Sequence, residues 1–174
     1  MNTIGSNEGL SAFAAPTPAW VFRTPGRVVA FGFGSGLLRP GPGTWGTALA
    51  WVLWLVVVSR FSDAAIGFIL ALSFLYGCWC CQKVGKELGR PDFGGMVWDE
   101  IVAFWLVLWI APGSFQAQLT AFILFRAFDI VKPAPIRYFD ARLKNGFGVM
   151  WDDILAAGYT LLVMAVIVRL EVLL

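Results

Sequence analysis

The sequence predicts an all-α fold, a compact membrane-associated helical bundle of about five apolar helices with a glycine- and proline-rich N-terminal loop. Hydrophobic residues make up 59% of the 174 residues and charged residues 14%, whereas soluble domains average roughly 45–50% and 25%. The mean hydropathy is +0.74. Because a chain of this length corresponds to about one domain, we expect a single domain embedded in a membrane.

The N-terminal quarter predicts irregular structure. Residues 1–26 contain several prolines and are expected to form an irregular lead-in, followed by one membrane domain over residues 27–174. Residues 32–47 are rich in glycine and include two prolines, a composition that disfavours a stable helix. We expect a loop there, with backbone N–H groups available to bind phosphate.

Five apolar segments follow this loop. They lie at about residues 47–59, 64–82, 100–111, 117–131 and 153–174. A helix that crosses a bilayer needs about 20 apolar residues. The second and fifth segments are long enough, whereas the other three are short, so the number of full spans is left open.

The basic residues alternate between the connections of these segments. Ten of the thirteen lie in three stretches: Arg23, Arg27 and Arg39; Lys83, Lys86 and Arg90; and Lys132, Arg137, Arg142 and Lys144. If all five segments crossed the membrane, the three stretches would share one side, which the positive-inside rule identifies as the cytoplasm.

A repeated motif supplies the first candidate catalytic residues. Residues 93–103 and 147–156 each contain a glycine, then a tryptophan, two adjacent carboxylates and an apolar run. The carboxylate pairs are Asp99-Glu100 and Asp152-Asp153. A single pair at a helix N-terminus is explained by capping. Two matched pairs beside apolar helices favour a shared cation, because buried carboxylates need compensation.

The residue types narrow the identity of that cation. The chain contains no histidine, and its three cysteines, Cys78, Cys80 and Cys81, are not spaced as a zinc site. Oxygen ligands alone favour Mg²⁺, Mn²⁺ or Ca²⁺. The absence of histidine also excludes Ser-His-Asp and Cys-His catalysis. The net charge of +2 gives no indication of nucleic-acid binding.

A third acidic group lies between the two copies of the motif. Arg126, Asp129 and Lys132 share one helical face, and prolines end the helix directly afterwards. An intrahelical ion pair between Asp129 and Lys132 is the alternative explanation, but the aromatic residues on either side favour a functional site. Candidate phosphate-binding residues are Gly43, Thr44, Arg126 and Lys144. For Lys144, attraction to lipid headgroups is an equally good explanation.

Taken in order, these motifs resemble those of the bacterial phosphatidylglycerophosphatase A family. The resemblance covers about residues 30–160 and rests on residues 40–47, 98–102, 125–136 and 146–153. It implies a Mg²⁺-dependent enzyme of the bacterial inner membrane that hydrolyses phosphatidylglycerophosphate to phosphatidylglycerol and inorganic phosphate. Ala103 and Asn145 replace glycines that are common in the family.

The resemblance also implies roles for individual residues. By position, the catalytic and metal-binding acids would be Asp99, Glu100, Asp129, Asp152 and Asp153, and Lys132 matches the Lys-Pro motif of the family. We expect the carboxylates to hold Mg²⁺ at the cytoplasmic interface, and Lys132, assisted by Arg126, to neutralise charge on the phosphoryl group. Attack by activated water and attack by an aspartate both stay open.

Two other functions compete with this interpretation. A phosphatidyltransferase acting on a CDP-activated lipid would need an array of spaced aspartates after an Asp-Gly, which the sequence lacks. A small cation transporter would place its paired carboxylates near the middle of the membrane. The sequence leaves the oligomeric state open.

Overall fold

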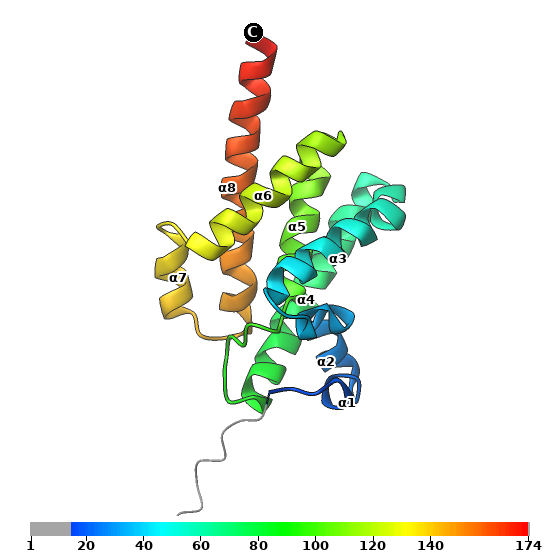
Figure 1. Cartoon of the computed structure of the whole chain (residues 1–174), viewed down its shortest axis with the longest axis vertical. Helices are drawn as coiled ribbons and strands as arrows, with labels where there is room; N and C mark the ends of the chain where they lie inside the picture. The colour runs from blue at the N-terminus through cyan, green and yellow to red at the C-terminus, as the bar shows by residue number, and fades with distance from the viewer. Residues whose placement is uncertain (1–14, 174) are drawn as a thin grey trace, which may run out of the picture.

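The computed structural model describes residues 15–173, and these residues form helices and turns with no strand among them. Five longer helices make the bundle (Figure 1). They are α3 (Pro42–Val56), α4 (Asp63–Glu87), α5 (Trp98–Ile110), α6 (Phe115–Val131) and α8 (Gly146–Leu173). The shorter elements are α1 (Pro18–Val21), α2 (Pro25–Ala30), α7 (Ile136–Arg142) and the 3₁₀ turns η1 (Gly32–Leu37) and η2 (Val58–Arg60). The predicted all-α bundle is confirmed, with more short helices than expected.

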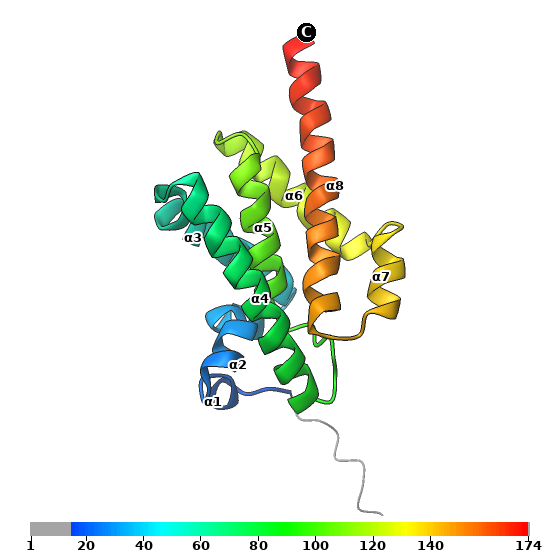
Figure 2. The ribbon, with the colours of Figure 1, turned by 180° about the vertical axis from the view of Figure 1, so that it is seen from behind.

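The short helix α5 forms the centre of the bundle. It packs against α3, α4, α6 and α8, and Figures 1 and 2 show it lying among these helices. Association between helices in a membrane depends on close packing and interhelical hydrogen bonds. Phe104 contacts Phe125 with ring centroids 5.6 Å apart, and Trp105 donates a 2.9 Å hydrogen bond to the Ala50 carbonyl. These contacts fix α5, which carries the first acidic pair.

Three helices are long and apolar enough to cross a membrane. They cover Pro42–Arg60, Asp63–Glu87 and Gly146–Leu170. The second and fifth apolar segments are therefore of spanning length, as predicted. The first segment also qualifies, because α3 begins five residues earlier than expected and continues into η2.

The irregular structure expected up to residue 26 is wrong for part of the described chain. Pro18 and Pro25 occupy the first turns of α1 and α2, a position where proline is favoured because its ring presets the helical φ. The Thr17 hydroxyl accepts a hydrogen bond from the Trp20 N–H and caps α1. Residues 1–14 lie outside the described part of the chain.

The loop expected over residues 32–47 is also mostly helical. η1 occupies its first part, and α3 begins at Pro42, so only residues 38–41 connect the two. Gly41 has φ +69° and precedes α3, a backbone conformation that glycine adopts without strain. A Cβ at Gly46 would lie 2.7 Å from the Val97 side chain. The glycines therefore permit close packing of helices and do not make a single phosphate-binding loop.

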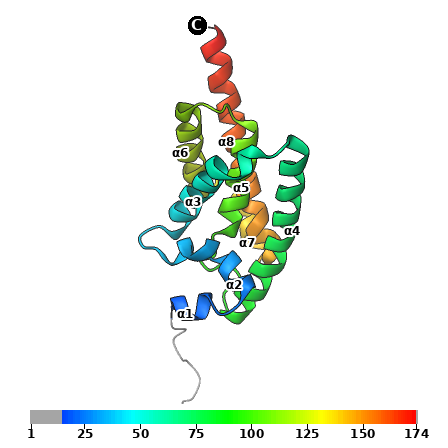
Figure 3. The ribbon, with the colours of Figure 1, turned by 90° about the vertical axis from the view of Figure 1, so that its right-hand side faces the viewer.

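The helix ends are sorted between the two ends of the bundle. The first turns of α5 and α8 and the last turn of α6 point toward the end that carries α1 and α2 (Figures 1 and 3). The connections α3–α4 and α5–α6 lie toward the opposite end, where the last turns of α8 project (Figure 2). The three basic stretches thus belong to connections at one end, as the alternating charge pattern predicts.

Candidate active site

The first acidic pair stands in the first turn of α5, as expected. Asp99 and Glu100 follow the helix start at Trp98. The preceding loop is fixed in place, because the Val97 N–H donates a 2.8 Å hydrogen bond to the Ala30 carbonyl. The Trp98 indole donates a 3.0 Å bond to the Ser73 carbonyl of α4. Hydrogen bonds to α2 and to α4 therefore determine where the two carboxylates lie.

The second acidic pair does not stand at a helix N-terminus, so the expected start of the last apolar segment, at about residue 153, was wrong. Helix α8 begins at Gly146, so Asp152 and Asp153 are its seventh and eighth residues and lie about two turns from its start. The Asn145 side chain accepts a 2.8 Å hydrogen bond from the Gly148 N–H, and Gly146 N–H donates to Gln82 at 2.8 Å. Because these side chains satisfy the first N–H groups of α8, capping does not explain this pair.

Three of the predicted acids converge. One carboxylate oxygen from each of Asp99, Glu100 and Asp153 lies within 4.8 Å of the others. Asp99 and Asp153 are buried, and four buried carboxylate oxygens have no hydrogen-bond partner: Asp99 Oδ1, Glu100 Oε2, Asp152 Oδ1 and Asp153 Oδ2. Unpaired buried charge is strongly unfavourable. The described residues therefore present an acidic cluster whose free oxygens fit the ligand chemistry of a hard cation.

The cations of α6 lie beside this cluster. Arg126 forms a 2.7 Å ion pair with Asp129 and lies 3.7 Å from a Glu100 oxygen. Its guanidinium is mostly buried, and its Nε has no hydrogen-bond partner. Asp129 adds a charge that repels Asp153 and Glu100. Arg126 therefore balances part of the negative charge on the α6 side.

Lys132 connects the second acidic pair to α7. It ends α6 in the left-handed conformation, with φ +46°, and forms ion pairs with Asp152 and, at 3.4 Å, with Asp140. Burial works against the ammonium charge, but the two carboxylates outweigh it and raise the pKa of Lys132. The expected alternative, an Asp129–Lys132 ion pair, does not occur, because each of these residues pairs elsewhere.

The candidate phosphate-binding residues divide into two groups. Gly43, in the first turn of α3, lies against the acidic cluster: a Cβ there would overlap the Glu100 carboxylate and lie 2.8 Å from Arg126 Nη2. Arg126 is therefore inside the site. Thr44 is exposed beside Gly43, and Lys144, with half its side chain exposed, pairs with Asp140 at 3.3 Å.

Asp140 is the site residue that sequence reasoning missed. It holds both Lys132 and Lys144 and sits in α7, outside the repeated motif. Its only signal in the sequence was a position shortly after the Lys-Pro motif.

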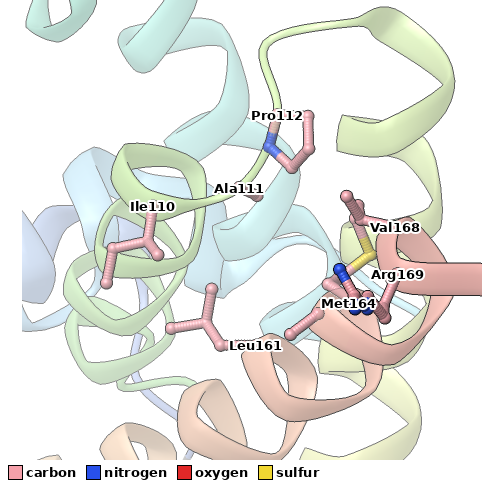
Figure 4. Close-up of a pocket in the computed structure, with 8 residues that line it drawn as sticks. Ile110, Ala111, Pro112, Leu161, Met164, Val168 and Arg169 are labelled. Atoms are coloured by element: carbon pink, nitrogen blue, oxygen red, sulfur yellow. The ribbon is translucent and has the colours of Figure 1, made fainter. Parts of the chain in front are cut away.

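The cysteines and the larger cavities lie outside this site. Cys80 and Cys81 are buried in α4 and all three cysteines are free, consistent with a packing role. One cavity of about 410 Å³ lies between the end of α5 and the distal part of α8 (Figure 4). Another of about 410 Å³ has an entirely apolar lining from α4, α5 and α8.

Fold and site together define a class of protein: a helical membrane protein with a buried carboxylate cluster flanked by arginine and lysine at one end of its bundle. Comparison with known families is more specific. The chain belongs to the phosphatidylglycerophosphatase A family, whose model matches residues 28–168.

Three curated relatives align over most of their own length. A phosphatidylglycerophosphatase A of Haemophilus influenzae is 49% identical, covering 80% of this chain and 86% of the relative. The protein of the same name from Escherichia coli is 35% identical, covering 76% and 77%. A protein of Bacteroides thetaiotaomicron, provisionally named a phosphatidylinositol-3-phosphatase, is 34% identical, covering 80% and 91%. No solved structure matches the chain.

Proposed function

We propose that this chain is a phosphatidylglycerophosphate phosphatase, which hydrolyses the terminal phosphomonoester to give phosphatidylglycerol and inorganic phosphate. The family membership and the names of two relatives support this substrate. The observation that carries the chemistry is the cluster of Asp99, Glu100 and Asp153, with Arg126 and Lys132 beside it. Such a site suits a phosphate group that is dianionic near neutral pH.

We further propose that the cluster binds Mg²⁺. Asp99, Glu100 and Asp153 would hold the ion, with Asp129 and Asp152 next to them. Asp99, Glu100 and Asp153 each have a buried oxygen without a hydrogen-bond partner, which supports the assignment. Ligation by oxygen alone favours Mg²⁺ over Zn²⁺. When bound, Mg²⁺ would polarise the phosphoryl group and neutralise its charge.

The protein's own cations orient the phosphate. Arg126 offers guanidinium N–H groups next to the cluster, and Lys132 keeps its proton because its pKa is raised. Both would stabilise charge on the phosphoryl oxygens as the ester bond breaks. The glycerol oxygen must leave with a proton, and a carboxylate that is free of the metal would act as the base toward water. Direct attack by an aspartate is the competing mechanism.

The assay is phosphate release from phosphatidylglycerophosphate by the purified full chain. We expect release with Mg²⁺, loss of release with EDTA, and recovery when Mg²⁺ is restored, with Zn²⁺ a poor substitute. Full activity in metal-free buffer would contradict the metal assignment. No phosphate release in any metal would contradict the proposed function itself.

Phosphatidylinositol 3-phosphate belongs in the same assay as a second substrate. The provisional name of the Bacteroides relative favours it, and both lipids present a phosphomonoester. We expect phosphatidylglycerophosphate to have the higher kcat/KM. The opposite order would reassign the substrate while leaving the phosphatase chemistry in place.

The transporter alternative is less well supported. A transport site is expected near the membrane midplane. The acids here lie in the first turn of α5 and about two turns from the start of α8, beside Arg126 and Lys132. Cation flux into proteoliposomes without phosphate release would favour a transporter.

We propose that the site faces the cytoplasm from a bacterial inner membrane. The three basic connections at the active-site end support this orientation through the positive-inside rule. In a variant without native cysteines, single cysteines at Lys86 and Lys144 should label from the cytoplasm and one at Ser114 from the other side. Labelling of Lys86 and Lys144 from opposite sides would contradict the proposal.

A further inference from the structure

One cavity, here called the distal cleft, is lined by apolar side chains and a single cationic one. It is the cavity of about 410 Å³ at the end of the bundle opposite the acids. Its lining consists of Ile110, Ala111, Pro112, Leu161, Met164, Ala165, Val168 and Arg169. Figure 4 shows Arg169 beside Met164 and Val168 on α8, with Ile110 and Pro112 on the other side of the cleft.

The position of Arg169 places it near the far membrane surface. Sixteen residues of α8 separate it from Asp153, which at 1.5 Å per residue is about 24 Å along the helix. The hydrocarbon core is about 30 Å thick. If the acids lie at one interface, the backbone of Arg169 therefore lies about 6 Å short of the other, and its long side chain reaches toward the lipid phosphates of the opposite leaflet.

Arg169 has no ion pair among residues 15–170, whose side chains the structure describes. Arg60, the other arginine at this end, donates a 2.7 Å hydrogen bond to the Val56 carbonyl of its own helical segment. A guanidinium is well suited to bind phosphate. The seven other lining residues are apolar and suit an acyl chain. The cleft therefore combines the two chemistries of one phospholipid molecule.

We propose that this cleft binds a phospholipid with an anionic headgroup, its phosphate on Arg169 and an acyl chain between α8 and the α5–α6 turn. The site is separate from the proposed active site and independent of the proposed function. A bound lipid would fill the gap between the α5–α6 turn and α8 and so brace this end of the bundle.

The test places a photoreactive amino acid at Leu161, inside the cleft, in the full chain reconstituted into vesicles. The vesicles contain equal amounts of phosphatidylcholine and phosphatidylserine with matched acyl chains. Phosphatidylserine is anionic and is neither substrate nor product of the proposed reaction. We expect crosslinking at Leu161 to favour phosphatidylserine by about fivefold, the effect of one cation on one anionic lipid.

Matched positions separate a specific site from ordinary solvation by lipid. Leu162 is exposed and outside the lining, so it should show no preference. Arg169→Gln should abolish the preference at Leu161, whereas Arg169→Lys and Arg60→Gln should largely keep it. Equal crosslinking of both lipids in the unmodified cleft, the same preference at Leu162, or an unchanged preference in Arg169→Gln would each overturn the proposal.

Native mass spectrometry gives a second readout that does not depend on the photoreactive residue. The Arg169→Gln protein should retain fewer phosphatidylserine molecules than the wild type, with unchanged phosphatidylcholine retention. Equal retention of phosphatidylserine by the two proteins would also overturn the proposal.

Discussion

Replacing Gly43 by alanine should damage the active site without unfolding the protein. In a helix, alanine is more stable than glycine by roughly 0.5–1 kcal/mol, so α3 itself tolerates the change. The added methyl group, however, would lie 2.8 Å from Arg126 Nη2 and closer still to the Glu100 carboxylate. Ordinary van der Waals contact begins near 3.4 Å, so these two groups must retreat, Arg126 by about 0.6 Å and Glu100 by on the order of 1 Å.

A displacement of about 1 Å in a catalytic constellation costs about 10²-fold in rate, which corresponds to roughly 2.7 kcal/mol of transition-state stabilisation. We therefore expect Gly43→Ala to lower kcat for phosphatidylglycerophosphate by about two orders of magnitude. Glu100 and Arg126 end in flexible groups that swing aside cheaply, so the thermal midpoint should change little.

Gly158→Ala provides the matched control for this variant. Gly158 lies in α8, and a Cβ there would meet no atom within 4 Å. It should keep full activity. Both proteins are compared by phosphate release at saturating Mg²⁺ and by thermal unfolding in the same detergent. Activity of Gly43→Ala within twofold of wild type would refute the reasoning, because Glu100 and Arg126 would then not need their observed positions.

Further substitutions test the carboxylates, the lysine network and the cysteines. Asp99→Asn and Asp153→Asn should each lower phosphate release by about 10²-fold or more, and the double variant should be little worse, since groups that act together are not additive; near-normal release by a folded variant would contradict a shared ion. Asp140→Asn should remove one of the two ion pairs of Lys132 and lower the free energy of unfolding by up to about 1 kcal/mol. Burial alone would raise the pKa of Asp140, but its lysine partners lower it overall. The stability difference between wild type and Asp140→Asn should therefore have its full size at pH values above 3.8, the ordinary pKa of an aspartate. It should vanish as the pH falls through the lowered pKa of Asp140 in the folded protein. A difference that persists in acid would exclude the ion pair as its cause. Cys80→Ala should keep turnover within a few-fold of wild type, and a large loss would give the cysteine a role beyond packing.

Much of the fold was readable from the sequence because its signals are local. Long apolar runs, such as that of α4, fix helices by composition alone. The repeated carboxylate pairs identified Asp99, Glu100, Asp152 and Asp153 as candidates, because placing adjacent carboxylates beside apolar membrane helices costs free energy in any fold. The lack of histidine restricted the ligands to oxygen atoms.

The local sequence mispredicted helix starts where tertiary contacts compensate for a low helix propensity. Glycine-rich residues 32–47 predicted a loop, yet α3 begins at Pro42, because glycines such as Gly46 allow it to pack closely against Val97. The start of α8 was placed too late, since its first N–H groups are satisfied by Asn145 and by Gln82 from α4. That second partner is distant in the sequence.

The sequence by itself thus determined the helical membrane class and the candidate acids of the repeated motif. Only the tertiary structure decided which charged groups lie together. Asp99, Glu100 and Asp153 converge. Arg126 forms its ion pair with Asp129, and Lys132 forms one with Asp152. Asp140 joined the network only through the turn between α6 and α7. The physical reason is that an electrostatic partner is chosen by distance in space, which depends on how four helices pack.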